Sequence, residues 1–186
     1  MPAYHSAYNE DTDSRVIGSM SLLPFRSKIR GPAGTPVDPN AMDIIDESID
    51  LFRANSLFRN FEIKGPADRT LIYLILFISD CLTKIASSRS PLLLPEATKQ
   101  LSTLAVDSFA LPGDAGFPLN ALYAAPRDRS EADALRGYLT QARQELVGRL
   151  IERVYNSGGG GAGVGQTPSK WWLAFTKRRF MGKSLS

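Results

Sequence analysis

Apolar residues recur at helical spacing in four stretches of the chain. The run from Leu71 to Ile78 is apolar at every position, and it follows Gly65-Pro66, a dipeptide that suits the start of a helix. A helix that is apolar on all sides is buried on all sides. This stretch is therefore predicted to be a central helix around which the others pack.

The other three stretches are apolar on one face. The first is predicted to begin near Asp38-Pro39, with Asp38 as N-cap, and to end near Asn55. Another helix follows Pro95, and the last is capped by Ser130 and ends near Asn156. The apolar stripes are Met42, Ile45, Ile49 and Phe52 in the first, Ala97, Leu101, Leu104 and Ala105 in the next, and Leu135, Leu139, Ala142, Leu146 and Leu150 in the last.

The remaining segments lack helical periodicity. Residues 1–37 are predicted to form an extended arm with one apolar anchor, although a loose tail is the competing interpretation. Prolines and glycines interrupt 111–119, where Phe117 and Leu119 are expected to return to the core. Residues 157–167 are predicted to form a flexible Gly-rich loop before a short final helix that starts around Thr167-Pro168. The anchor of the arm consists of Met20, Leu22, Leu23 and Phe25.

No stretch shows the alternation of a strand, so the prediction is an all-α fold in one compact domain over residues 1–186. The length of 186 residues, with 43% hydrophobic and 22% charged residues, is typical of a soluble globular domain.

The chain has one cysteine, Cys81, which is interpreted as a small buried apolar group. No secretory signal is visible, and a cytoplasmic location is expected.

The residues that catalysis needs are scarce. The sole histidine, His5, lies in the irregular arm, so neither a metal site nor a Ser-His-Asp site has the ligands or the scaffold it requires. The Gly-rich run is not followed by Gly-Lys-Ser/Thr, which argues against a phosphate-binding loop. The sequence therefore predicts a protein that is not an enzyme and has no cofactor.

Positive charge concentrates at the C-terminal end. The formal net charge is +3, and residues 168–186 hold five of the 22 Lys and Arg and no acid, which leaves 17 bases against 19 acids elsewhere. Trp and Arg are the residues that dominate the energetics of protein interfaces. The predicted partner-binding residues are Lys170, Trp171, Trp172, Lys177, Arg178, Arg179 and Lys183.

Three kinds of partner suit this composition. Nucleic acid would use the basic and aromatic side chains, but the small net charge weakens this interpretation. A membrane surface would need a clean apolar face, whereas a continuous helix would place Leu173 and Phe180 opposite the tryptophans. An acidic protein surface remains, with one tryptophan expected in the core and the other in the interface.

Six segments in a fixed order give the chain a specific resemblance. They begin with Pro2-Ala-Tyr-His-Ser6 and LLPFRS (22–27) and continue with ADRTLIYLILFISDCL (67–82) and LPGDAGFPLN (111–120). YLTQARQEL (138–146) and PSKWWLAFTKRRFMGKSL (168–185) complete the set. Over nearly its whole length the chain resembles the 21 kDa subunit family (subunit 3) of the actin-related protein 2/3 complex. It departs from that pattern at 31–40, around 87–95 and at 158–165.

The resemblance implies a helical, non-catalytic subunit in an assembly that nucleates branched actin filaments. It implies contact with actin-related protein 3, with other subunits of the seven-subunit complex and, at the branch junction, with the mother filament and actin-related protein 2. It implies neither nucleic-acid binding nor membrane insertion. The alternative is a stand-alone basic and aromatic module for nucleic acid or an anionic membrane surface.

Overall fold

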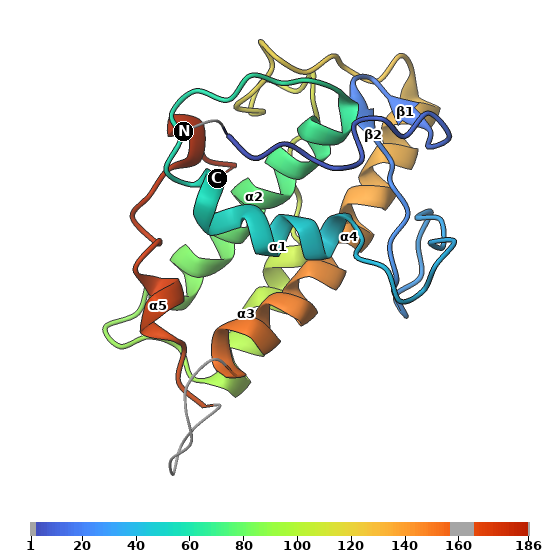
Figure 1. The fold of residues 1–186 in the computed structure, drawn as a ribbon. Coiled ribbons are helices and arrows are strands. Elements are labelled where there is room, and N and C mark those ends of the chain that lie inside the picture. The colour runs from blue at the N-terminus through green and yellow to red at the C-terminus, as the bar shows by residue number, and fades with distance from the viewer. Residues whose placement is uncertain (1–2, 157–165, 186) are drawn as a thin grey trace.

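The computed structural model describes residues 3–156 and 166–185, and these residues are mostly helical (Figure 1). In chain order the elements are β1 (Val16–Ile17), β2 (Met20–Ser21), α1 (Ile44–Asn55), α2 (Pro66–Ala86), α3 (Leu94–Val106), α4 (Arg129–Asn156), α5 (Lys170–Leu173) and a final 3-10 turn (Phe180–Gly182). The all-α prediction therefore holds for the bulk of the described chain, but it missed a small two-stranded sheet. Each strand has two residues, too few for an alternating pattern to appear in the sequence.

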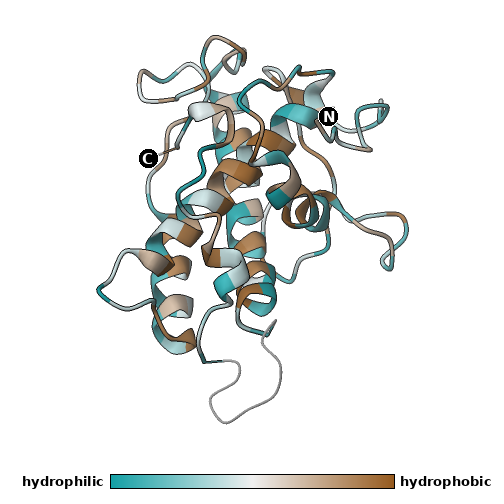
Figure 2. Cartoon of the chain, turned by 60° about the vertical axis from the view of Figure 1, so that its left-hand side comes forward, coloured by the Kyte–Doolittle hydropathy of each residue, from teal (hydrophilic) through white to brown (hydrophobic). Residues whose placement is uncertain are grey.

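Helix α2 lies at the centre of the fold, as predicted. It contacts α1, α3, α4, α5 and β2, and every side chain from Leu71 to Ile78 is at most 1% exposed. Figure 2 shows the apolar residues concentrated along the helices in the middle of the molecule. The helix begins at Pro66, directly after an extended Gly65. Burial raises the pKa of the Cys81 thiol, so this side chain acts as a neutral apolar group.

Helix α1 begins later than predicted. Its N-cap is Asp43 rather than Asp38: the Asp43 carboxylate accepts the backbone N–H groups of Ile45 and Asp46, each at 3.1 Å. Asp46 accepts the N–H of Asp43 in return at 3.4 Å, which completes a capping box. Met42 therefore lies outside the helix and is 55% exposed. The rest of the predicted stripe is buried: Ile45, Ile49 and Phe52.

Helices α3 and α4 pack along each other and against α2. Helix α3 begins at Leu94, close to its predicted start. Helix α4 ends at Asn156 as predicted, but the Ser130 cap is wrong, because the Asp128 carboxylate accepts the N–H of Glu131 at 2.8 Å and Ser130 lies inside the first turn. The buried stripe residues are Ala97, Leu101 and Ala105 in α3 and Leu135, Leu139, Ala142, Leu146 and Leu150 in α4, while Leu104 is half-buried.

The N-terminal arm, described from residue 3 to residue 37, lies against α1, α2 and α4. β1 and β2 pair antiparallel around a turn that contains Gly18. Gly18 has a φ of 59°, and a Cβ there would lie 2.4 Å from the carbonyl oxygen of Ala124, so this turn requires glycine. The predicted anchor is confirmed, with Leu22 half-buried and these three residues buried: Met20, Leu23 and Phe25.

The connection between α3 and α4 is irregular, as the prolines and glycines predicted. Phe117 and Leu119 are 4% and 2% exposed, which confirms that this segment returns to the core. The Phe117 ring packs against Tyr123, with centroids 5.3 Å apart. The Tyr123 hydroxyl donates to the backbone carbonyl of Arg69 at 2.6 Å and ties the connection to α2.

The C-terminal segment, residues 166–185, departs most from the prediction. Helix α5 is a single turn that ends at Leu173, and the chain then turns toward the 3-10 turn, where Met181 has a φ of 56°. Phe180 is therefore not on the helix face opposite the tryptophans. It is fully buried, with its ring centroid 5.7 Å from that of Phe61. Of the predicted flexible loop 157–167, residues 157–165 lie outside the described residues.

Candidate protein-interaction surface

The two adjacent tryptophans of α5 lie in opposite environments. The N–H of Ser169 donates to the carbonyl of Val154 at 2.8 Å, which fixes the start of α5 against α4. Trp172 is 2% exposed, and its ring stacks on Phe52 of α1 with centroids 6.0 Å apart. Trp171 is 68% exposed. Neighbouring helical residues differ in direction by about 100°, so one ring faces the core and the other the solvent.

Arg53 of α1 lies beside both tryptophans. Its guanidinium carbon is 5.6 Å from the ring centre of Trp171 and 5.1 Å from that of Trp172. These distances are within the range of a cation–π interaction. Another apolar side chain, Leu57, is 55% exposed just beyond the end of α1. Tryptophan and arginine are both enriched among the hot-spot residues of protein interfaces.

Three consecutive cations follow α5 and form what we call the basic ridge: Lys177, Arg178 and Arg179, all exposed. Phe175, just before the ridge, packs on Phe52 with ring centroids 6.3 Å apart. Phe180, just after it, is fully buried. The two phenylalanines hold the backbone on either side of the ridge, so its charged groups face the solvent from a fixed position.

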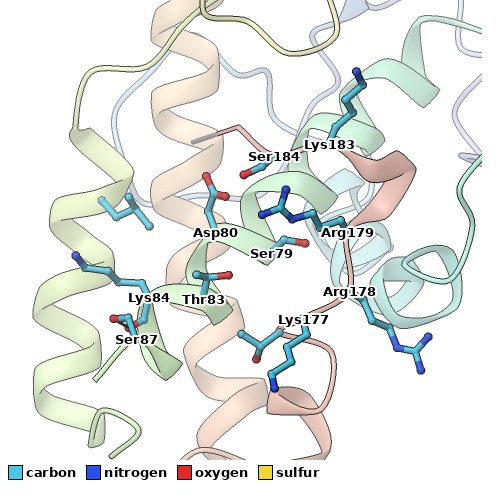
Figure 3. Close-up of a pocket in the computed structure, with 12 residues that line it drawn as sticks. Ser79, Asp80, Thr83, Lys84, Ser87, Lys177, Arg178, Arg179, Lys183 and Ser184 are labelled. Atoms are coloured by element: carbon cyan, nitrogen blue, oxygen red, sulfur yellow. Dashed lines mark hydrogen bonds between the residues drawn. The ribbon is translucent and has the colours of Figure 1, made fainter. Parts of the chain in front are cut away.

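The basic ridge separates two grooves. The polar groove, of about 660 Å³, lies between the ridge and α2 (Figure 3). The mixed groove, of about 630 Å³, lies between the ridge and the segment that follows α1. Besides the ridge, the polar groove is lined by Ser79, Asp80, Thr83, Lys84, Ser87, Leu104, Thr176, Lys183 and Ser184, and the mixed groove by Ser56, Leu57, Arg59, Met181 and Gly182.

The cations of the C-terminal segment share the polar groove with one acid, Asp80. Within residues 3–156 and 166–185, no ion pair involves Lys170, Lys183 or the basic ridge. Arg149 of α4, in contrast, contacts Asp43 at 2.6 Å and Asp46 at 3.0 Å. The C-terminal surface therefore carries more positive than negative charge.

His5 and the buried carboxylates have structural contacts. His5 Nδ1 lies 2.7 Å from Asp68 Oδ2, and its ring packs on Phe61. Burial alone would raise the pKa of Asp68, but the N–H groups of Ser6 and Lys64 and the His5 ring hold that pKa below its ordinary value.

In the part of the chain that the structure describes, no three His, Cys, Asp or Glu are placed to hold a metal ion. None of the described helices is long and apolar enough to cross a membrane.

The structure places six of the seven predicted partner-binding residues at the surface, and Trp172 in the core. The six exposed residues are Lys170, Trp171, Lys177, Arg178, Arg179 and Lys183. The sequence did not indicate the residues that other elements bring to this surface, because nothing local links them to the C-terminal segment. These are Arg53, Leu57 and Arg59.

Exposed tryptophan and arginine side chains on one surface are typical of protein interfaces. The family model P21-Arc, the ARP2/3 complex ARPC3 (21 kDa) subunit, matches residues 1–185. The chain belongs to this family, which confirms the resemblance found in the sequence.

Curated relatives agree along the whole chain. "Actin-related protein 2/3 complex subunit 3" of Schizosaccharomyces pombe is 54% identical over 185 residues, which cover all of both chains. The protein of that name in Saccharomyces cerevisiae is 53% identical over 187 residues, again covering both chains completely. The Dictyostelium discoideum relative is 45% identical over 183 residues, or 98% of this chain and 99% of its own.

Proposed function

We propose that this chain is a structural, non-catalytic subunit of an actin-related protein 2/3 complex and supports the nucleation of branched actin filaments. The full-length similarity to proteins named as subunit 3 of that complex supports the assignment. The subunit acts by contact, without a cofactor, in the cytoplasm at the actin cytoskeleton.

The observation that carries this proposal is the basic ridge, which lies between the half-buried Phe175 and the buried Phe180 and has no ion pairs in the described chain. We assign the ridge and Trp171 to contact with an acidic, actin-like surface. Actin-related protein 3 is the proposed partner within the complex, with the mother filament and actin-related protein 2 as partners at the branch junction. The mixed groove adds Leu57 and Met181, which supply the apolar part that a protein interface needs.

A triple charge reversal tests the proposal: Lys177→Glu, Arg178→Glu and Arg179→Glu together. Recovery of the complex from cells, or branch density in an actin assay, is expected to fall about tenfold or more, because like charges then face the partner. The wild-type contact is expected to weaken as salt rises, since exposed charges are screened. The free energy of unfolding is expected to change by less than about 0.5 kcal/mol, because the three side chains are exposed.

A matched control reverses three exposed cations outside this surface, Lys28, Arg30 and Arg89. This variant is expected to keep complex recovery and branching. Unchanged branching and complex recovery in the ridge variant would refute the assignment of the ridge. Salt-resistant binding of the chain to single-stranded RNA or phosphatidylserine vesicles would favour the stand-alone module for nucleic acid or membrane surfaces instead.

A further inference from the structure

The polar groove differs in chemistry from the mixed groove on the other side of the basic ridge. Among the described residues that line it, Leu104 is the one apolar side chain and Asp80 the one acid. Protein interfaces have an apolar core, rich in aromatic residues. The polar groove lacks such a core, so its composition fits a small, highly charged ligand better than a protein surface. Hydroxyl groups make up much of its wall: Ser79, Thr83, Ser87, Thr176 and Ser184.

The cations of the polar groove come from two walls. Lys84 belongs to α2, whereas the basic ridge and Lys183 belong to the C-terminal segment. Figure 3 shows Arg179 extending from that segment toward α2, while Arg178 extends away from the groove. A groove of about 660 Å³ is much larger than a single phosphate ion and has the size of a small-molecule site. A ligand with several phosphates on one compact frame spans that space.

We infer that the polar groove binds a compact ligand with several phosphates, of the inositol polyphosphate class, either free or as the head group of a phosphoinositide lipid. Lys84 and Arg179 supply the charge from the two walls, which outweighs the one acid, Asp80, and the guanidinium of Arg179 offers two parallel N–H donors to one phosphate. Ser79 adds a donor at the base of the groove. Its hydroxyl is buried and has no hydrogen-bond partner among the described residues.

The shared ridge gives this site a regulatory consequence. The basic ridge lines both grooves, so a phosphate ligand in the polar groove neutralises charge that the proposed actin-like partner uses. The ligand therefore weakens the protein contact, a consequence that rests on the proposed function. Binding of the ligand itself does not rest on it, because the polar groove is formed by this chain alone.

Calorimetric titration of the full chain with inositol hexakisphosphate tests the site, at about 0.15 M salt, where distant charges are screened. Lys84→Glu is expected to lower the affinity about tenfold, because it reverses a charge on the α2 wall. Arg59→Glu is the matched control, since Arg59 is also exposed but lines the mixed groove. It is expected to change the affinity less than about twofold, because screening limits its influence.

Vesicles distinguish the two sources of the phosphates. Sedimentation with phosphatidylcholine vesicles that contain phosphatidylinositol bisphosphate, dependent on Lys84, assigns the ligand to a lipid head group. Binding of the soluble phosphate without sedimentation assigns it to a free ligand.

Three results would overturn the site: no binding of either probe, equal losses in Lys84→Glu and Arg59→Glu, or equally tight binding of single-stranded RNA. The Lys84→Glu variant also separates the two proposals. Loss of phosphate binding with normal branching supports the phosphate site and leaves the ridge contact intact. Loss of branching in the ridge variant, together with no phosphate binding by the wild type, supports the protein contact alone.

Discussion

The two ends of the chain are anchored in the same way, but their charged side chains differ in how they are paired. The N-terminal arm and the C-terminal segment are both largely non-helical, rich in polar residues and anchored by buried aromatic rings such as Phe25 and Phe180. In the arm, His5 and Arg26 pair with carboxylates of α2 and α1. In the C-terminal segment, the basic ridge has no ion pair within the described residues. Ion pairs within the fold therefore distinguish His5 and Arg26 of the arm from the ridge, which we propose as a binding surface.

Asp43 shows how closely the arm is joined to the helices. Its buried carboxylate accepts the N–H of Arg26 at 3.0 Å and the guanidinium of Arg149 at 2.6 Å. Burial alone would raise the pKa of Asp43, but these donors and the N–H of Asp46 hold it below its ordinary value. Loss of contacts in the arm is therefore expected to reduce stability, whereas loss of the ridge is expected to reduce binding.

The largest expected effect on stability distinguishes the two tryptophans of the C-terminal segment. Trp172→Ala should lower the free energy of unfolding by about 4 kcal/mol, because it empties a core position stacked on Phe52. Trp171→Ala should lower it by less than about 1 kcal/mol, because that ring is 68% exposed. Urea unfolding followed by circular dichroism measures both values. Equal losses would mean that the segment cannot be divided into a core tryptophan and a surface tryptophan.

The second prediction compares two arginines one turn apart on α4. Arg149→Ala should cost about 3 kcal/mol, because it leaves the buried carboxylate of Asp43 without its main cation. Arg153→Ala is the control: its pair with Asp50 is 2.7 Å long but exposed, so the cost should stay below about 1 kcal/mol. The same urea experiment measures both. A cost for Arg149 no larger than that for Arg153 would show that the arm does not depend on this cluster.

The helices were predictable where the signal is local. Pro66 and the apolar run after it determine the start and the burial of α2 without reference to any other element. The start of α1 was not predictable from local signals, because Asp38 and Asp43 are equally good N-cap residues on local chemistry. The choice of Asp43 is favoured by Arg149, which lies 106 residues away in sequence and binds its carboxylate. Contacts of this kind cannot be found by periodicity.

The candidate surface was predictable in composition but not in shape. The concentration of cations and tryptophans between Lys170 and Lys183 is plain in the sequence. Which tryptophan is buried depends on where α5 ends, and it ends after one turn. Arg53 of α1 and Leu57 just after that helix complete the surface, and their contribution appears only when the helices are packed.

The smallest expected effect concerns the arm and pH. Because the pKa of Asp68 is lowered in the folded protein, its ionised form stabilises the fold above the unfolded value of about 3.9, and this contribution is lost as pH falls through the folded value. Asp43 acts in the same direction. Burial raises the pKa of Glu47, so its protonation on acidification partly offsets the loss.

The free energy of unfolding of the wild type, measured in urea from pH 7 to pH 3, is therefore expected to fall below about pH 4. The variant Asp68→Asn should be less stable at pH 7, because the charge-assisted hydrogen bonds from Ser6 and Lys64 are weakened. Its loss of stability on acidification should be shallower, since the substituted side chain takes up no proton. Parallel curves would mean that Asp68 holds the arm by shape rather than by charge, and the contrast between a charge-paired arm and an unpaired ridge would then rest on Arg26, which pairs with Asp46 at 2.7 Å and with Asp43 at 3.4 Å.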